Sequence, residues 1–257
     1  MKVVILAWGL WTRLSEETTI KPKPMVEIGW KPILWHIMKL YSHYGYNEFV
    51  IALWYKWEYI KEWFSNYYLH WSDVTFDLKN NSMDVHNNNC ENWKVTLVDT
   101  WADTLTWWRI KKIIEKWYIE ENEFMMTYWD WVSDINIKEL VEFHKSHWKS
   151  STLTAVQPEW RFWGLHINDN QITKFLEKKD NIDTWINAWY MVLNKNIVNL
   201  IENDKIPLET VPLEKLATEW SLMSYKHKGF WFAMDTLQNK NTLEKMWSKW
   251  NAPWKVW

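Results

Sequence analysis

The chain has 257 residues, 47% of them hydrophobic, and a formal net charge of −2. That length fits one large α/β domain or two small ones, and the balanced charge gives no overall field that attracts nucleic acid or an anionic membrane, so neither is expected as a partner. The single cysteine, Cys90, excludes an intrachain disulfide, and the apolar run at residues 3–7 is too short for a signal peptide or a membrane span. We therefore expect a cytoplasmic protein.

The chain opens with a predicted buried strand that runs into a cationic loop. The strand is the apolar run at residues 3–7, and the loop that follows carries Thr12, Arg13, Lys21 and Lys23. Backbone N–H groups in a tight turn, together with neighbouring cations, suit an anion such as a nucleoside triphosphate. A solvated loop after an edge strand explains the same residues about equally well.

Helices and strands alternate along the next part of the chain. The hydrophobic spacing predicts a helix from residue 31 to about 41, a strand at 48–53, a helix at 56–64, a possible strand at 74–78 within the polar segment 70–92, and a strand at 94–99. Strands that alternate with helices in this way are typical of a doubly wound, mostly parallel, Rossmann-like α/β sheet flanked by helices.

The segment at residues 100–109 leads into a helix predicted over 110–116. From the residues alone, Thr106 is expected to be the N-cap of this helix and Arg109 to be solvated. A ligand-binding role for the segment stays open as the alternative.

The strand predicted at residues 123–127 is followed by Tyr128 and Asp130. A carboxylate just beyond the C-terminal end of a parallel strand lies where open α/β sheets bind ligands. Mg²⁺ prefers hard oxygen ligands of this kind, so Asp130 is the first metal candidate. An ordinary turn aspartate is the alternative.

The second half continues the pattern to the end of the chain. Predicted elements are a helix at 137–147, a strand at 151–156, helical stretches at 197–201 and 213–218, a last strand at 222–226 and a closing helix at 236–250. His144 and His147 could share a helix face, but no third ligand follows nearby and a zinc site is not expected. No linker and no internal repeat interrupts the chain, so a single domain over residues 1–257 is predicted.

Tryptophan and glycine usage is abnormal. The chain has 26 Trp and only 5 Gly, whereas glycine averages about 7% of residues, and many of the Trp lie in turn contexts such as 54–57, 107–108 and 129–131. Because a side chain is strained at positive φ and glycine is not, we infer that many of these positions belong to glycine in the ancestral pattern. The alternative is an aromatic platform for carbohydrate, but such platforms cluster on one face.

Several motifs, taken in order, resemble those of sugar-1-phosphate nucleotidyltransferases, and in particular the glucose-1-phosphate cytidylyltransferase branch. They are A-x-G-L-x-T-R-L at residues 7–14, K-P-K-P at 21–24, T-x-T-x-x-R at 104–109, Y-x-D at 128–130, F-L-E-K at 175–178, W-I-N at 185–187 and M-D-T at 234–236. The main departure is Trp at glycine positions of the family, including Trp8, Trp11 and Trp101.

The resemblance implies a set of site residues and one cofactor. The implied nucleotide-binding residues are Leu6, Ala7, Trp8, Gly9, Leu10, Trp11, Thr12, Arg13, Lys23, Thr104, Arg109 and Tyr128. The implied sugar-phosphate-binding residues are Glu177, Lys178, Asn187 and Trp231. Among these, Arg13, Lys23 and Lys178 are implied to be catalytic, and Asp130 and Asp235 are implied to hold Mg²⁺.

The reaction that the resemblance implies is transfer of a cytidylyl group from CTP to glucose 1-phosphate, giving CDP-glucose and pyrophosphate in a homo-oligomeric enzyme. Catalysis of this kind depends on positioning and on neutralising charge. Two alternatives stay open: a thymidylyl- or uridylyltransferase acting on a hexose 1-phosphate, and a non-catalytic protein that binds nucleotide or sugar phosphate. Overpacking costs about 1–3 kcal/mol per site, so the tryptophans are expected to weaken catalysis even where the fold is retained.

Overall fold

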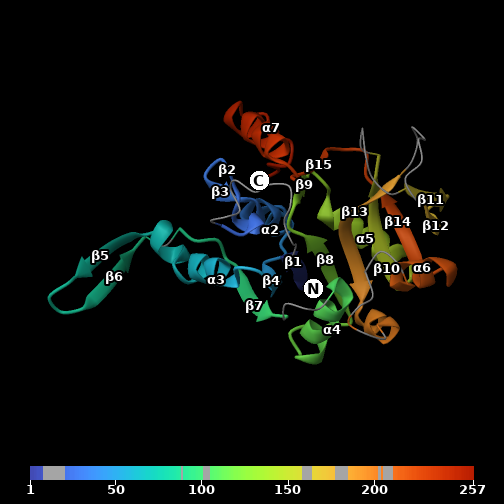
Figure 1. Cartoon of the computed structure of the whole chain (residues 1–257), viewed down its shortest axis with the longest axis horizontal. Helices are drawn as coiled ribbons and strands as arrows, with labels where there is room; N and C mark the ends of the chain where they lie inside the picture. Colours follow the sequence, from blue (N-terminus) through green and yellow to red (C-terminus); the bar gives the residue numbers. More distant parts are fainter. Residues whose placement is uncertain are drawn as a thin grey trace.

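The computed structural model describes residues 1–7, 21–87, 89–100, 105–157, 164–176, 185–201, 204 and 211–257. A nine-stranded sheet forms its centre, in the order β11-β12-β14-β10-β13-β8-β1-β4-β7 (Figure 1). These strands are β1 (Val3–Ala7), β4 (Glu48–Leu53), β7 (Lys94–Asp99), β8 (Glu123–Tyr128), β10 (Ser151–Val156), β11 (Gly164–Asn168), β12 (Gln171–Leu176), β13 (Ile186–Asn194) and β14 (Leu222–Lys226).

The strand directions confirm the predicted fold class. All strands of the large sheet except β12 and β13 run in one direction, so the sheet is mostly parallel. From β1 the chain winds to β4 and β7 on one side and returns to β8 on the other. The C-terminal ends of β1 and β8 therefore flank the point at which the winding reverses, which is where open α/β sheets bind ligands.

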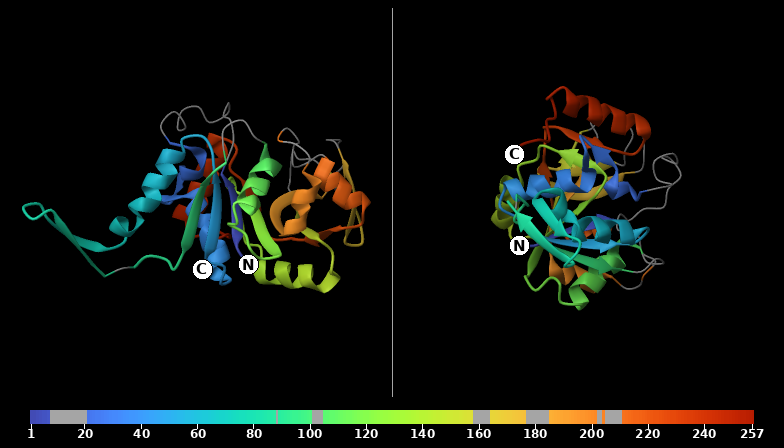
Figure 2. Two further views of the ribbon diagram at one scale, coloured as in Figure 1. Left: turned by 90° about the horizontal axis from the view of Figure 1, so that it is seen from below. Right: turned by 90° about the vertical axis from the view of Figure 1, so that its left-hand side faces the viewer.

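Helices lie on both faces of this sheet (Figure 2). They are α2 (Ile33–His43), α3 (Trp57–Ser65), α4 (Thr106–Glu115), α5 (Ile137–His147), α6 (Val211–Thr218) and α7 (Leu237–Ser248), with short 3₁₀ helices η1 (Lys23–Met25), η2 (Tyr67–His70) and η3 (Lys195–Leu200). The strands at the centre of the parallel half are buried on both faces; β1, for example, has at most 4% of any side chain exposed. Within the described ranges, no helix is both long and apolar enough to cross a membrane.

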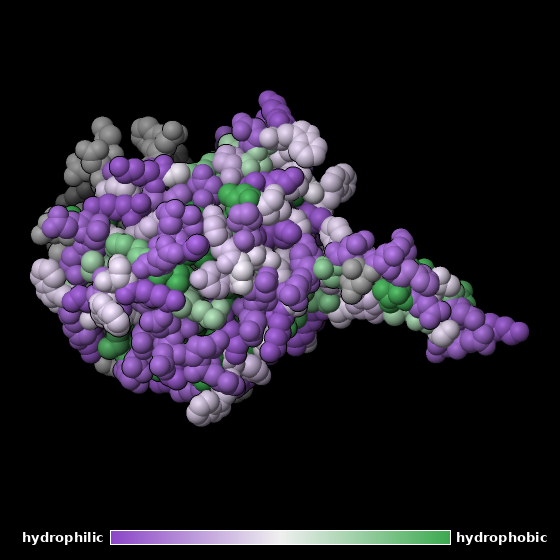
Figure 3. Space-filling model, turned by 180° about the vertical axis from the view of Figure 1, so that it is seen from behind, coloured by the Kyte–Doolittle hydropathy of each residue, from purple (hydrophilic) through white to green (hydrophobic). Residues whose placement is uncertain are grey.

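Three small two-stranded sheets accompany the large one. They are β2 (Glu27–Ile28) with β3 (Lys31–Pro32), β5 (Asp73–Asp77) with β6 (Ser82–His86), and β9 (Trp131–Ser133) with β15 (Trp231–Ala233). The β5–β6 hairpin projects from the body as an arm (Figure 1), and Phe76 and Met83, which pair across it, are 57% and 40% exposed. Figure 3 shows hydrophobic patches between hydrophilic residues along this arm.

Most predicted elements match the structure, and the differences have local causes. The strands at 3–7, 48–53, 94–99, 151–156 and 222–226 and the helix at 137–147 are confirmed. Residues 31–32 form β3, so α2 begins at Ile33, and residues 195–200 form a 3₁₀ helix. The strand at 222–226 is not the last, because β15 follows it. Strands β2, β6, β9, β11, β12, β13 and β15 were not predicted. Strand β6 lies in a polar segment, β2, β9 and β15 span only two or three residues, and β11, β12 and β13 lie in or beside stretches that were interpreted only as binding motifs.

The helix ends support the interpretation that many tryptophans stand at glycine positions. Six Trp residues have φ between 56° and 66°: Trp117, Trp148, Trp220 and Trp250 follow helices, Trp30 lies between β2 and β3, and Trp189 lies within β13. After α4, Trp117 N donates to Ile114 O at 3.0 Å and Tyr118 N donates to Ile113 O at 3.2 Å. This pair of bonds is the Schellman motif, whose left-handed residue is usually glycine. Gly45, with φ of 86°, holds the same place after α2.

Replacing Trp148 with glycine is expected to stabilise the protein. Trp148 ends α5 with φ of 57° and is 93% exposed, so the substitution relieves backbone strain and removes little packing. The left-handed conformation costs a non-glycine residue about 1–2 kcal/mol, and part of that gain is offset by the freedom of glycine in the unfolded chain. We expect the unfolding free energy to rise by about 0.5–1 kcal/mol, and Tm by a few degrees.

Thermal and urea denaturation measure the effect, with Gly45→Ala as the reciprocal control. A Cβ at Gly45 meets nothing within 4 Å, so any loss of stability there reports backbone conformation alone. A lower Tm for Trp148→Gly would contradict the strain argument.

Candidate functional site

The ends of β1 and β8 form the floor of the candidate site. Leu6 of β1 pairs with Tyr128 of β8, and Ala7 is the last residue of β1. The hydroxyl of Tyr128 donates to Thr106 Oγ1 at 3.3 Å, which brings the start of α4 to the same place. Three of the residues implied to bind nucleotide, Leu6, Ala7 and Tyr128, therefore lie together at the switch point of the sheet.

The small β9–β15 sheet brings Asp130 and Asp235 together. Ala233 pairs with Trp131, and Met234 N donates to Asp130 O at 2.7 Å, which extends the ladder by one step. Asp235 is the next residue along. The Lys23 ammonium lies 4.0 Å from Asp130 Oδ2 and 3.6 Å from Asp235 Oδ1. The two carboxylates thus approach one point, as the sequence-based hypothesis requires.

The three charges differ in burial. Lys23 is 7% exposed and lies over the Trp129 ring, 4.8 Å from its centroid. The side chain of Asp130 is 16% exposed and that of Asp235 45%. Burial raises the pKa of Asp130 to about 7, and the charge of Asp235 adds to the rise against the opposing effect of Lys23. Asp130 therefore forms the inner wall of the site and Asp235 its rim.

This donor set fits a divalent cation. Among the described residues, Asp130 Oδ1 is buried and has no hydrogen-bond partner, and a buried oxygen of this kind calls for a proton or a cation. Over the same part of the chain, no group of three or more His, Cys, Asp and Glu side chains gathers around a possible metal. Two carboxylates suit Mg²⁺, which usually completes its shell with water and phosphate oxygens.

The structure corrects the residue-based expectations for the start of α4. Leu105, not Thr106, is the N-cap, and it makes no side-chain cap bond. Arg109 is fully buried rather than solvated: its Nη1 donates to Thr100 Oγ1 at 2.7 Å and its guanidinium lies 5.7 Å from the centre of the Trp54 ring. Burial lowers its pKa to about 10, which leaves it charged at neutral pH. Arg109 is thus a fixed buried cation beside the floor of the site.

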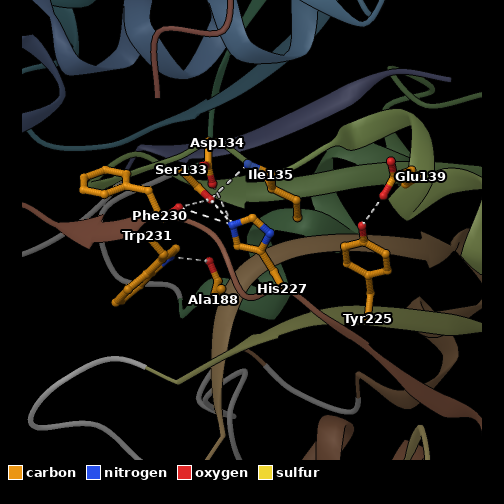
Figure 4. A network of polar contacts seen from close by, with 9 residues as sticks. All are labelled: Ser133, Asp134, Ile135, Glu139, Ala188, Tyr225, His227, Phe230 and Trp231. Carbon is orange, nitrogen blue, oxygen red and sulfur yellow. Dashed lines mark hydrogen bonds and ion pairs between the residues drawn. The ribbon is translucent and has the colours of Figure 1, made fainter. Parts of the chain in front are cut away.

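Trp231 is the first residue of β15, and Asn187 of β13 lies near it. Asn187 Oδ1 accepts from Trp189 N at 2.8 Å, whereas its buried Nδ2 has no partner among the described residues. Trp231 Nε1 donates to Ala188 O at 3.2 Å (Figure 4). Trp131 stacks on Trp189 and also contacts Trp231. Of the four residues implied to bind sugar phosphate, Trp231 therefore belongs to an aromatic cluster with Trp131 and Trp189, and Asn187 borders that cluster.

The remaining implied site residues lie outside the described residues. They are Trp8, Gly9, Leu10, Trp11, Thr12, Arg13, Thr104, Glu177 and Lys178. Sequence reasoning also missed a polar network at the far end of the β9–β15 sheet, formed by Ser133, Asp134 and His227 (Figure 4). The only signal for it was the Ser-Asp pair that closes the stretch Y-x-D-x-V-S-D at residues 128–134.

Comparison with known proteins decides the family. The nucleotidyl transferase family model matches residues 2–231, which is most of the chain. The chain belongs to the nucleotidyl transferase family. This nucleotidyl transferase is 51% identical over 258 residues to the glucose-1-phosphate cytidylyltransferase of Salmonella typhimurium, with full coverage of both chains. It is 39% identical, also over the full length of both, to the probable glucose-1-phosphate cytidylyltransferase of Bacillus subtilis.

Solved structures agree with this nucleotidyl transferase in fold. HddC from Yersinia pseudotuberculosis matches with a TM-score of 0.77 at 24% identity, over 96% of this chain and 99% of that one. A UDP-glucose pyrophosphorylase crystallised with UDP-glucose matches with a TM-score of 0.73 at 16% identity, over 96% and 98% of the two chains. At these identities the likeness concerns the fold alone.

Proposed function

We propose that this nucleotidyl transferase is a Mg²⁺-dependent glucose-1-phosphate cytidylyltransferase, which converts CTP and glucose 1-phosphate into CDP-glucose and pyrophosphate. The full-length relatives at 51% and 39% identity carry that name. The structural observation that carries the proposal is the approach of Asp130 and Asp235 to the Lys23 ammonium, beside the ends of β1 and β8. Two carboxylates and a buried cation at that point suit a triphosphate and its metal.

The proposed reaction is an in-line displacement. A phosphate oxygen of glucose 1-phosphate attacks the α-phosphorus of CTP. The bond from the α-phosphorus to the α,β-bridging oxygen breaks, and pyrophosphate leaves with that electron pair, so no covalent enzyme intermediate forms. Asp130 and Asp235 would hold Mg²⁺, which when bound would neutralise negative charge on the phosphates. Lys23 binds the triphosphate and stabilises the charge that develops on its oxygens. Chemistry of this kind depends on position and charge rather than on a nucleophilic side chain.

The other implied residues have binding roles in this proposal. Leu6 and Ala7 with residues 8–13, which include the catalytic Arg13, line the triphosphate. Thr104, Arg109 and Tyr128 line the part of the site that binds the nucleotide. The burial of Arg109 supports a rigid wall there. Glu177, Lys178, Asn187 and Trp231 hold glucose 1-phosphate, with Lys178 on its phosphate. The buried Nδ2 of Asn187 supports this role, since it lacks a partner among the described residues.

Release of pyrophosphate from each of the four nucleoside triphosphates with glucose 1-phosphate tests the proposed function. We expect product with CTP and Mg²⁺ and none when EDTA removes the metal. Faster turnover with dTTP or UTP would change the assigned base, and binding of CTP without any product would support a non-catalytic protein. Trp8 and Trp11 stand at positions where the family has glycine. We expect turnover to rise when glycine replaces them.

Three further properties belong to the proposal. The continuous nine-stranded sheet supports a single domain over residues 1–257. The single cysteine supports a cytoplasmic location. A homo-oligomer is proposed from the family resemblance, and light scattering of the purified chain measures it directly.

A further inference from the structure

Both carboxylates of the candidate metal site are carried at one end of the β9–β15 sheet. Asp130 lies between β8 and β9, two residues after the end of β8, so the large sheet fixes its position through the chain itself. Asp235 follows β15, and its position depends on where β15 lies against β9. Backbone bonds close the ladder at both ends, from Met234 N to Asp130 O at 2.7 Å and from Asp134 N to Phe230 O at 3.2 Å. A shift of β15 against β9 at the Phe230–Asp134 end of the ladder therefore also moves Asp235 at the other end.

His227 binds that distant end. Its Nε2 lies 2.9 Å from Asp134 Oδ1 and 3.3 Å from both Ser133 Oγ and Phe230 O (Figure 4). The Ser133 hydroxyl itself donates to Phe230 O at 2.7 Å. Because Asp134 and Phe230 offer only acceptors to this nitrogen, we assign its hydrogen to Nε2 from the network. The imidazole thus joins β9 to the chain that enters β15.

The main chain of His227 belongs to the large sheet. His227 N donates to Ala155 O at 2.8 Å, which continues the parallel pairing of β14 with β10 by one residue. The backbone of His227 is therefore attached to the nine-stranded sheet while its side chain holds the two-stranded sheet. This residue is a bridge between the two, at the end opposite the carboxylates.

Gly229 lies tightly against the contact between Asp134 and His227. A Cβ added at Gly229 would lie 2.4 Å from Asp134 Oδ1 and 2.7 Å from His227 Cε1, so the contact leaves no room for any side chain there. The chain holds only 5 glycines and places Trp at many turns. Gly229 is one of these five, and it lies where the pair Asp134–His227 leaves no space for a Cβ.

We propose that His227 is a positioning residue for the metal site: through Asp134 and the β9–β15 ladder, it fixes the placement of Asp235 relative to Asp130. The inference rests on the proposed function, in which these two carboxylates hold a divalent cation. A metal site tolerates little displacement of its ligands, and residues that orient ligands without touching the metal typically contribute about 10–100-fold in affinity or activity.

Binding of Mn²⁺ to the full chain, followed by electron paramagnetic resonance, tests this positioning role without requiring turnover. His227→Ala is expected to weaken Mn²⁺ binding about 10–100-fold. His227→Gln, which keeps an N–H donor of similar reach, is expected to recover most of it. Gly229→Ala leaves every polar group in place but crowds the contact, so it should weaken binding as well.

Tyr225→Phe is the matched control. Tyr225 lies on β14, two residues before His227, and its hydroxyl donates to Glu139 Oε2 of α5 at 2.9 Å (Figure 4), so the variant removes one hydrogen bond that leads away from the β9–β15 sheet. We expect its Mn²⁺ affinity to equal that of the parent chain. Steady-state kinetics with CTP and glucose 1-phosphate should show a lower kcat for His227→Ala and no change for Tyr225→Phe.

The outcomes separate the two proposals. If the parent chain binds Mn²⁺ and His227→Ala binds it equally well while only its Tm falls, His227 is merely structural and the positioning role is overturned. If the parent chain itself binds no Mn²⁺, the metal site fails and the positioning role fails with it. If His227→Ala does not fold, Gly229→Ala and His227→Gln decide the question by their Mn²⁺ affinities.

Discussion

The Asp130→Asn variant is expected to lose Mg²⁺-dependent turnover by about three orders of magnitude or more, and yet to be more stable than the parent chain in metal-free buffer at about pH 8. The loss of turnover follows from the proposed metal role, since the neutral amide is a far weaker Mg²⁺ ligand and a bound metal is worth several kcal/mol of transition-state stabilisation. The gain in stability follows from burial, because the carboxylate that the amide replaces is 16% exposed and ionises only at a cost in free energy.

The sign of the pH dependence follows from the direction of the pKa shift. Burial raises the pKa of Asp130 from 3.8 to about 7. Between these values the unfolded chain has released the proton and the folded chain still holds it, so the unfolding free energy of the parent falls as pH rises from about 4 to about 7. The amide of the Asp130→Asn variant has no such proton to lose. At about 1.4 kcal/mol per pKa unit, the advantage of the variant should reach the order of 2–4 kcal/mol above about pH 7.

Urea denaturation in EDTA at about pH 5 and about pH 8 measures this difference, and Asp235→Asn is the control. Asp235 is 45% exposed, so its carboxylate stays hydrated and its replacement should change stability much less. A stability gap between parent and Asp130→Asn that does not vary with pH would contradict the burial argument. Because the metal must displace the proton, Mg²⁺ affinity of the parent should rise with pH up to about pH 7.

Replacing Lys23 with methionine is expected to lower kcat by about 100–1,000-fold, the range measured for loss of a single buried donor to a developing negative charge. Lys23 is 7% exposed and its ammonium lies within 4.0 Å of both carboxylates, so it is a buried cation in direct reach of the proposed metal site. Methionine keeps most of the volume of the side chain and removes its charge. Without that charge, Asp130 and Asp235 repel each other, so the metal-free variant should also lose stability.

Lys21→Met is the matched control for Lys23→Met. Lys21 precedes the same 3₁₀ helix, but its side chain is 49% exposed and its ammonium pairs with Glu27 at 2.8 Å on the surface. Exposed pairs of this kind contribute about 0–1 kcal/mol, so the control should keep its rate and its stability. Equal rates for the parent and Lys23→Met would refute the catalytic role of Lys23.

The sequence predicted the parts of the fold that local hydrophobic pattern determines. The runs that form β1, β4 and β8 are largely apolar because both faces of a parallel sheet are covered, so the positions of these strands could be predicted from the sequence. The pairing of β9 with β15 was not, because each strand spans three residues and the two are far apart in the chain. The approach of Asp130 to Asp235 depends on that pairing, and only the family resemblance pointed to it.

The error over Arg109 has a different origin. A cation near the start of an amphipathic helix is normally solvated, and no local pattern in the residues indicates otherwise. Its partners, the hydroxyl of Thr100 and the ring of Trp54, follow β7 and β4, and only the folded sheet brings them beside α4. Long-range contacts of this kind leave no periodic signal in the residues that make them.

The helix-end tryptophans have a practical consequence for chemical labelling. Trp117, Trp148 and Trp250 are 76%, 93% and 88% exposed. At each of them the left-handed turn forms although the residue carries an indole ring. Gly229 is the opposite case, since even a methyl group would collide with Asp134 there. A cysteine introduced at residue 117, 148 or 250 is therefore a suitable attachment point for a fluorophore or spin label, because a ring of comparable bulk already points into water at each of them.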